Sequence, residues 1–152
     1  MLNYASQCLD TQLALSRLSP HVTESELAVL IVDDDPDVAP LVDRALRPYN
    51  ICTEAVMRGV DAIARMRRSR YDLVVLDLAM GDVHGFDVLR MIRELPLNRD
   101  IPVLILTADG SHEAMARSFG IGADEFVKKP FDPRELGMRA FRLMRPFGQR
   151  TS

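Results

Sequence analysis

Short apolar runs, rich in β-branched residues, alternate with longer amphipathic stretches along most of the chain. The runs lie at residues 27–32, 51–55, 72–76, 102–106 and 125–127. Four of the five are continuous or nearly continuous in apolar residues, which is typical of strands with both faces buried in a parallel sheet. The pattern therefore predicts five strands, each followed by a helix.

The stretches after the runs place apolar side chains at helical spacing, so that each has one apolar face. The predicted helices lie at about 37–47, 57–69, 86–95, 111–120 and 132–144. Strands and helices that alternate in this way favour a parallel sheet with helices on both faces and right-handed crossovers. A ligand site is then expected at the carboxyl ends of the strands.

Several residues indicate where these helices begin and end. Asp37 is the preferred N-cap of the first helix, because Pro40 then falls in the first turn, where a proline costs little. If that helix instead begins at Pro36, one backbone hydrogen bond is lost. Ser111 is a suitable N-cap and Gly120 a suitable end for the fourth helix, and Pro133 suits the first position of the fifth.

The predicted folded unit spans residues 27–145 and leaves two ends outside it. Residues 1–26 are either a partly ordered extension or a helix that packs on the domain or on a second copy. The apolar residues that suggest this helix are Leu2, Ala5, Leu9 and Leu13. Residues 146–152 are expected to form a frayed tail.

Composition narrows the class of protein. The chain has 152 residues, of which 47% are apolar and 27% charged, as in one soluble globular domain. No apolar run is long enough to span a membrane, and the first residues do not resemble a secretory signal. Cys8 and Cys52 are the only cysteines, which favours a reducing, cytoplasmic location. The net charge of −3 gives no reason to expect nucleic-acid binding.

Polar residues follow four of the predicted strands at the point where each strand ends. Asp33, Asp34 and Asp35 follow the first, and Asp77 follows the third. Thr107 follows the fourth strand and Lys129 the fifth. Because the ends of parallel strands meet at one edge of a sheet, we expect these side chains to lie together.

Clustered carboxylates repel one another, and a hard divalent cation such as Mg²⁺ relieves that repulsion. Beside such an ion, Asp77 is suited to attack a phosphoryl donor, while Lys129 and Thr107 can neutralise and hydrogen-bond the phosphoryl oxygens. Each residue alone has an ordinary explanation, such as an acidic helix start or a solvated loop lysine. Their joint occurrence at the strand ends favours a site.

Four segments of the chain are also characteristic of a known family: VLIVDDDPDV, DLVVLDLAMGDVHGFDVLRMIR, PVLILTA and GADEFVKKPF. They occur in order over residues 27–145, and the chain resembles the receiver domain of two-component response regulators. The resemblance implies a flavodoxin-like fold, a doubly wound, five-stranded parallel sheet with strand order 2-1-3-4-5. It also implies a function as a phosphorylated signalling module.

The resemblance implies a role for each acidic residue of the predicted site. Asp77 is the expected phosphoryl acceptor, Asp34 a direct ligand of Mg²⁺ (or Mn²⁺), and Asp33 a ligand through water. The backbone carbonyl of Ala79 is expected to complete the metal ligands, whereas Asp35 lies outside the site.

The remaining family roles fall on the last two strands. Thr107 is the expected switch hydroxyl and Lys129 the phosphate-binding lysine, joined to Pro130 by a cis peptide bond. Phe126 occupies the position of the switch aromatic. In the family, activation changes a face that corresponds here to the helix at 111–120, the strand at 125–127 and the helix at 132–144.

The sequence departs from the usual family pattern around Asp77. Gly81 replaces a proline, which leaves the loop looser, and His84 replaces a common acidic residue. We interpret His84 as a surface loop residue rather than a ligand. Ala79 and Asp109 occupy positions that tune the lifetime of the phosphoryl group in this family, and Phe126 lacks a tyrosine hydroxyl.

The predicted function is acceptance of a phosphoryl group from a sensor histidine kinase or a histidine phosphotransferase, without enzyme activity in the metabolic sense. One alternative is an interaction module that works without phosphorylation, although such modules usually lack one of the residues present here. A second is an aspartyl-phosphate phosphatase, which Ala79 disfavours because those enzymes have a second Asp at that position.

Homodimerisation through the switching face is a further expectation. The last helix places four arginines beside Glu135. They are either a solvated basic face, or a surface for salt bridges between copies or for an acidic partner. The four arginines are Arg134, Arg139, Arg142 and Arg145. The residues after Arg145 are too few for a DNA-binding module, so neither nucleic-acid nor membrane binding is expected. A stand-alone domain and a fragment of a longer regulator both stay open.

Overall fold

The computed structural model describes residues 27–144. The strands are β1 (Leu27–Val32), β2 (Ile51–Val56), β3 (Leu73–Leu76), β4 (Val103–Thr107) and β5 (Glu125–Lys128). The helices are α2 (Val38–Leu46), α3 (Gly59–Met66), α4 (Gly85–Glu94), α5 (His112–Ile121) and α6 (Pro133–Leu143), and a 3₁₀ turn, η1 (Arg47–Tyr49), follows α2. The predictions for residues 1–26 and 146–152 lie outside the described residues.

All five strands are parallel, in the order β2-β1-β3-β4-β5. This confirms the predicted fold class and strand order. Because the chain crosses from one side of β1 to the other between β2 and β3, the order reverses at β1. Ligands of such sheets bind beyond the carboxyl ends of the strands at this point.

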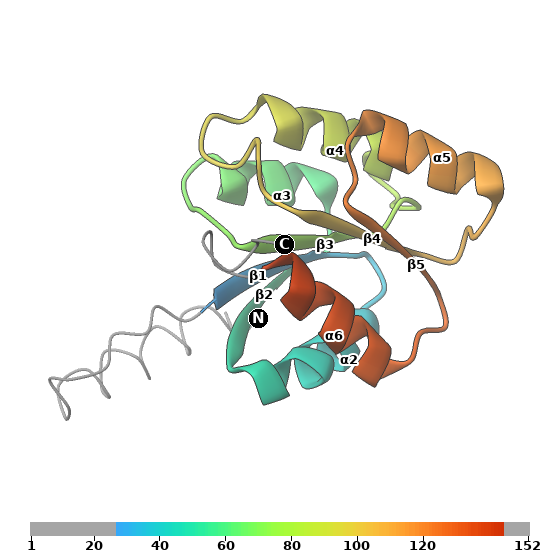
Figure 1. Cartoon of the computed structure of the whole chain (residues 1–152). Helices are drawn as coiled ribbons and strands as arrows, with labels where there is room; N and C mark the ends of the chain where they lie inside the picture. Colours follow the sequence, from blue (N-terminus) through green and yellow to red (C-terminus); the bar gives the residue numbers. More distant parts are fainter. Residues whose placement is uncertain (1–26, 145–152) are drawn as a thin grey trace, which may run out of the picture.

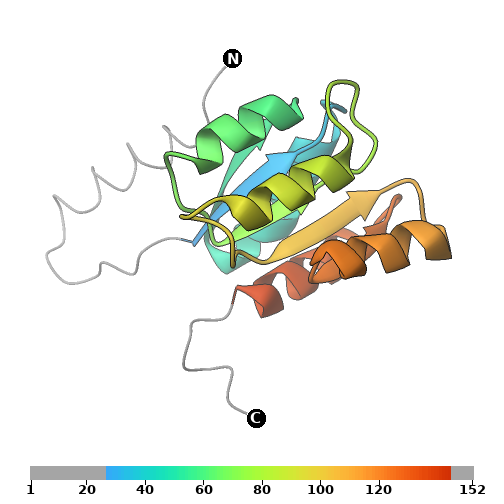
Figure 2. The ribbon, with the colours of Figure 1, turned by 90° about the horizontal axis from the view of Figure 1, so that it is seen from above.

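The sheet lies between two layers of helices, with α3, α4 and α5 on one face and α2 and α6 on the other (Figures 1 and 2). Alternate residues of β1 point to opposite layers: Leu30 and Val32 pack toward α3 and α4, whereas Val29 and Ile31 pack toward α2 and α6. Both faces are thus buried, which explains why the strand residues are apolar without alternation. No helix within residues 27–144 is long and apolar enough to cross a membrane.

Most of the predicted helix starts are found. The Ser111 hydroxyl accepts a hydrogen bond from the Ala114 N–H at the start of α5. Asp132, which directly precedes Pro133, accepts one from the Arg134 N–H at the start of α6. Asp37 occupies the N-cap position of α2, and Pro40 lies in the first turn as predicted. The Asp37 side chain makes no capping hydrogen bond, however, because its backbone is already helical at that position.

The predicted end of α5 at Gly120 is wrong. The helix continues through Gly120 to Ile121 and ends at Gly122, which has a φ of 120°. The Gly122 N–H donates to the carbonyls of Ser118 and Phe119 and closes the last turn. Gly120 and Gly122 are both suited to the positive φ that ends a helix, and the sequence alone does not show which of the two adopts it.

Helices α2 and α6 approach each other closely at Gly137. A Cβ atom on Gly137 would lie 2.6 Å from the carbonyl oxygen of Ala45 and 3.0 Å from a ring carbon of Tyr49. Glycine is therefore required for this spacing of the two helices. Gly120, inside α5, offers a comparison, because a Cβ there would meet no atom within 4 Å.

We predict opposite effects for alanine at these two positions. Gly137→Ala should lower the free energy of unfolding by about 1–3 kcal/mol, because the methyl group overpacks a contact with backbone. Gly120→Ala should raise it by up to about 1 kcal/mol, the gain in helix propensity at an open position. Urea denaturation of both variants measures the difference. A stabilised Gly137→Ala variant would contradict the close contact of α2 and α6.

Candidate functional site

The polar residues predicted at the strand ends gather at one edge of the sheet. Asp33 and Asp77 directly follow β1 and β3, Thr107 is the last residue of β4, and Lys129 directly follows β5. Backbone hydrogen bonds between neighbouring strands hold them there: the Asp77 N–H donates to Val32 O at 2.9 Å and the Lys129 N–H donates to Thr107 O at 2.8 Å. The parallel sheet thus explains their proximity.

Carboxylate oxygens of Asp33, Asp34 and Asp77 lie within 4.8 Å of one another. Asp33 and Asp77 are each 5% exposed, whereas Asp34 is exposed to solvent. The Lys129 ammonium donates to Asp33 at 2.7 Å and lies 3.5 Å from an Asp77 oxygen. The cluster therefore contains three carboxylates and one cation. Asp35 is exposed and contacts it only through its N–H, which donates to Asp33 Oδ1.

The charges of this cluster are unbalanced, and the pKa values respond. Burial raises the pKa of Asp33 above its usual value, and the neighbouring Asp77 adds to the rise, although Lys129 and the Asp35 N–H act against it. Burial of Lys129 opposes its charge, but its hydrogen bond to Asp33 and the charges of Asp33 and Asp77 prevail, so its pKa is raised. Lys129 thus opposes the rise in the pKa of Asp33 but does not cancel the effect of burial.

The donor set fits a hard divalent cation. Mg²⁺ and Mn²⁺ prefer oxygen ligands, and the three carboxylates offer such oxygens close together. A bound cation would also offset the charge of Asp77, which adds to the rise that burial causes in the pKa of Asp33. The Ala79 N–H donates to Asp77 Oδ1 at 3.2 Å, which holds residue 79 beside the acceptor carboxylate. The expected role of its carbonyl remains a prediction.

Thr107 is fully buried, and its hydroxyl oxygen accepts a hydrogen bond from the Asp109 N–H at 3.3 Å. Asp109 is fully exposed, and its hydrogen bonds with Ser111 lower the pKa of its carboxyl group. The Lys129–Pro130 peptide bond is cis, as the family resemblance implies. The threonine and the lysine therefore flank the acidic cluster from the last two strands.

The loop between Asp77 and Gly85 has two anchors that sequence reasoning missed. Asp82 accepts hydrogen bonds from the N–H groups of Gly59 and Val60, at the start of α3. Although slight burial opposes the charge of Asp82, these donors lower its pKa. His84, predicted as a surface residue, is indeed exposed, but it also caps α4: its Nδ1 accepts from the Phe86 N–H at 3.2 Å. The position of His84, just before the predicted start of this helix, was the sequence signal that could have indicated the cap.

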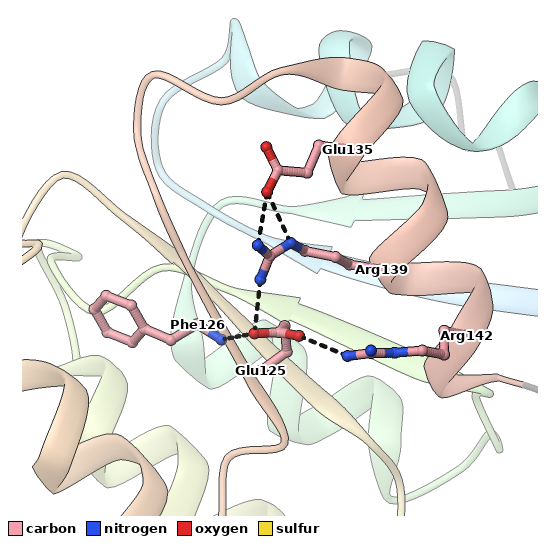
Figure 3. Close-up of polar contacts among 5 residues, drawn as sticks. All are labelled: Glu125, Phe126, Glu135, Arg139 and Arg142. Atoms are coloured by element: carbon pink, nitrogen blue, oxygen red, sulfur yellow. Dashed lines mark hydrogen bonds and ion pairs between the residues drawn. The ribbon is translucent and has the colours of Figure 1, made fainter.

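Phe126 lies on β5, is 7% exposed and belongs to the core between the sheet and α3–α5. Figure 3 shows its ring pointing away from the charged residues beside it. The next residue toward the N-terminus, Glu125, points instead toward α6. Successive side chains of a strand face opposite sides of the sheet. At Glu125 and Phe126, β5 therefore has one charged and one apolar side.

Glu125 is the centre of an ion-pair cluster that sequence reasoning missed (Figure 3). It accepts from Arg139 at 3.1 Å and from Arg142 at 3.2 Å, while Arg139 also binds Glu135 at 2.6 Å. Two of the α6 arginines that were expected to pair with a second copy or an acidic partner, Arg139 and Arg142, thus bind carboxylates of the same chain. Arg145 lies outside the described residues.

Comparison with known proteins identifies the same kind of domain. Residues 29–140 match the family model of the response regulator receiver domain. The chain is 34% identical over 125 residues to the transcriptional regulatory protein ResD of Bacillus subtilis, covering 82% of this chain and 51% of ResD. It is 36% identical over 111 residues to the DNA-binding response regulator MtrA of Mycolicibacterium smegmatis, covering 73% of this chain and 47% of MtrA. The chain thus spans about half the length of these relatives.

Solved structures agree with this match. The BeF₃-activated receiver domain of DrrB from Thermotoga maritima superposes with a TM-score of 0.72 at 28% identity, covering 80% of this chain and 99% of that domain. The receiver domain of the Francisella response regulator 1452 gives a TM-score of 0.72 at 29% identity, covering 78% and 97%.

The raised pKa of Asp33 leads to a prediction for the metal-free protein. A carboxyl group with a higher pKa in the folded state stabilises the fold below its unfolded pKa, and this contribution is lost as pH rises through the folded pKa. In the presence of a chelator, Asp33→Asn should therefore be more stable than the parent chain at pH 7, with a smaller difference at pH 4.

Chemical denaturation at both pH values measures this effect. Asp35→Asn is the matched control, because Asp35 is adjacent but exposed, and it should leave stability nearly unchanged. An Asp33→Asn variant less stable than the parent at pH 7 would show that the ion pair with Lys129 outweighs burial and repulsion.

Proposed function

The chain belongs to the family of response regulator receiver domains, and on this basis we propose that Asp77 accepts a phosphoryl group in a two-component phosphorelay. The donor is a phosphohistidine on a sensor histidine kinase or a histidine phosphotransferase. The main support is the buried Asp77 carboxylate, which lies 3.5 Å from the Lys129 ammonium and beside two more carboxylates. Domains of this family are signalling modules rather than classical enzymes.

In the proposed step, a carboxylate oxygen of Asp77 attacks the phosphorus atom. The P–O bond forms as the P–N bond of the phosphohistidine breaks, and the bonding electron pair leaves with the imidazole. The Lys129 ammonium offsets charge on the phosphoryl oxygens, and the Thr107 hydroxyl donates a hydrogen bond to one of them. Attack by water later releases inorganic phosphate and restores the carboxylate.

The proposal includes a divalent cation, Mg²⁺ or Mn²⁺. Asp34 and Asp77 are its direct carboxylate ligands, Asp33 binds through water, and the carbonyl of Ala79 completes the set. When bound, the cation neutralises charge on the phosphoryl oxygens. This chain's own contribution is to hold the ligands at the ends of β1 and β3, where backbone hydrogen bonds fix them.

We propose that Thr107 and Phe126 are the switch residues. Thr107 moves toward the phosphoryl group, and Phe126 changes position within the face formed by α5, β5 and α6. Support comes from their location: Thr107 ends β4, and Phe126 lies on the neighbouring strand with Ile105 as its register partner. Added negative charge at Asp77 then favours one of two states of this face.

The partners follow from the family. The relatives are named as transcriptional regulators, and this chain corresponds to about half of their length. We propose that it is phosphorylated in the cytoplasm by a kinase or phosphotransferase and that the α5-β5-α6 face pairs two copies. Residues 27–144 themselves bind no nucleic acid in this proposal.

Incubation with Mg²⁺ and a small acyl phosphate, followed by intact-mass measurement, tests the acceptor. The wild-type chain should gain one phosphoryl group, and Asp77→Asn should gain none, because the amide is not a nucleophile. Lys129→Gln should react more slowly, by about tenfold or more, since a charge beside the reacting group is lost.

No gain of mass in the wild type, with Mg²⁺ binding demonstrated separately, would contradict phosphoryl acceptance. That result would favour the interaction module that works without phosphorylation. A gain in the Asp77→Asn variant as well would place the acceptor elsewhere.

A further inference from the structure

The start of α4 packs directly on the backbone of the proposed acceptor. A Cβ atom on Gly85 would lie 2.4 Å from the Cα of Leu78 and 2.5 Å from the carbonyl oxygen of Asp77. The Gly85 N–H also donates to Leu78 O at 2.8 Å. Any shift of the first turn of α4 is therefore transmitted to Asp77 through backbone contact.

His84 fixes this first turn in two ways. Its Nδ1 accepts the Phe86 N–H, which caps the helix. Its ring also stacks on the ring of Phe86, with centroids 4.8 Å apart and an angle of 23° between the planes. Phe86 is buried, so the exposed histidine is held against a fixed partner.

Arg117 connects this stack to a second helix. The residue lies on α5, and its guanidinium carbon is 4.3 Å from the centroid of the Phe86 ring. Among residues 27–144, no carboxylate lies within ion-pair distance of Arg117, so the ring is its principal electrostatic partner. A cation over an aromatic face is attracted to it even at an exposed position.

The middle of the same loop is open to solvent. Gly81 is exposed, and a Cβ atom there would meet nothing within 4 Å. On either side of Gly81, the loop is held by Met80 and Val83, which are partly buried and pack against the core. Asp82 anchors it to α3, and the contacts of His84 anchor it to α4.

We propose that His84 is a positioning residue for phosphorylation of Asp77, and that it acts together with Arg117 through the Phe86 ring. The two side chains hold the first turn of α4, and this turn holds the acceptor backbone. Helix α5 is part of the face that we propose to switch, so the same stack joins the acceptor loop to that face. This inference rests on the proposed acceptance of phosphate at Asp77.

The rate of phosphorylation by a small acyl phosphate at saturating Mg²⁺, followed by intact mass in the full chain, tests this role. His84→Ala should slow the reaction by about fivefold. This is the factor by which the loss of one helix cap shifts the equilibrium between the ordered and the frayed first turn of α4. Arg117→Gln, on a different helix, should also slow it. Arg90→Gln is the matched control on α4: Arg90 pairs with Asp87 and should react at the wild-type rate.

Two conservative variants separate positioning from general stability. His84→Asn retains an acceptor for the Phe86 N–H, and His84→Phe retains a ring that can stack. Each should recover part of the rate. The double variant His84→Ala with Arg117→Gln should lose less than the product of the two single losses, because both side chains act through one ring.

The outcomes distinguish this inference from the proposed function. If the wild type does not gain phosphate, acceptance at Asp77 fails and the inference fails with it. If the wild type gains phosphate, but His84→Ala and Arg117→Gln react at its rate, only the positioning role is overturned. Fully independent effects in the double variant would overturn the coupling through Phe86.

Discussion

The burial of carboxylates at one edge of the sheet is the constraint on which the rest of the site depends. Asp33 and Asp77 are almost fully buried, and Asp34 lies beside them, yet within residues 27–144 only Lys129 forms an ion pair with them. Water would screen such charges at the surface, whereas burial does not. The fold must therefore hold them in place by its backbone, and the apolar core on both faces of the sheet provides the stability that offsets this cost.

The sequence was sufficient to predict the sheet and the residues at its edge. Continuous apolar strands can only be buried on both faces, and the ends of parallel strands must meet, so Asp77, Thr107 and Lys129 were expected together. The end of α5 was predicted at Gly120 rather than at Gly122 because both residues are glycines and either could end the helix. The contacts of Asp82 and Glu125 were missed for another reason, because their partners lie on elements that are distant in sequence. The cap made by His84 is local, and only its position directly before a helix indicated it.

The two sides of β5 have different properties: one faces the apolar core and the other faces charged residues of α6. Phe126 belongs to the apolar core, while Glu125 binds arginines of α6 (Figure 3). These ion pairs are partly exposed, so each contributes little to stability, and they depend on salt. Their effect is on geometry: Arg139 joins Glu125 to Glu135 and so fixes the orientation of α6 against the strand.

The contact at Gly137 has a consequence for related domains. The carbonyl of Ala45 lies where any side chain at position 137 would need to be, so this spacing of α2 and α6 is accessible only to glycine. The separation of packed helices depends on the side chains at their crossing point. A homologous domain with alanine or a larger residue at the equivalent position must hold these two helices farther apart. The residue type at that one position therefore indicates how closely the two helices approach each other in each member of the family.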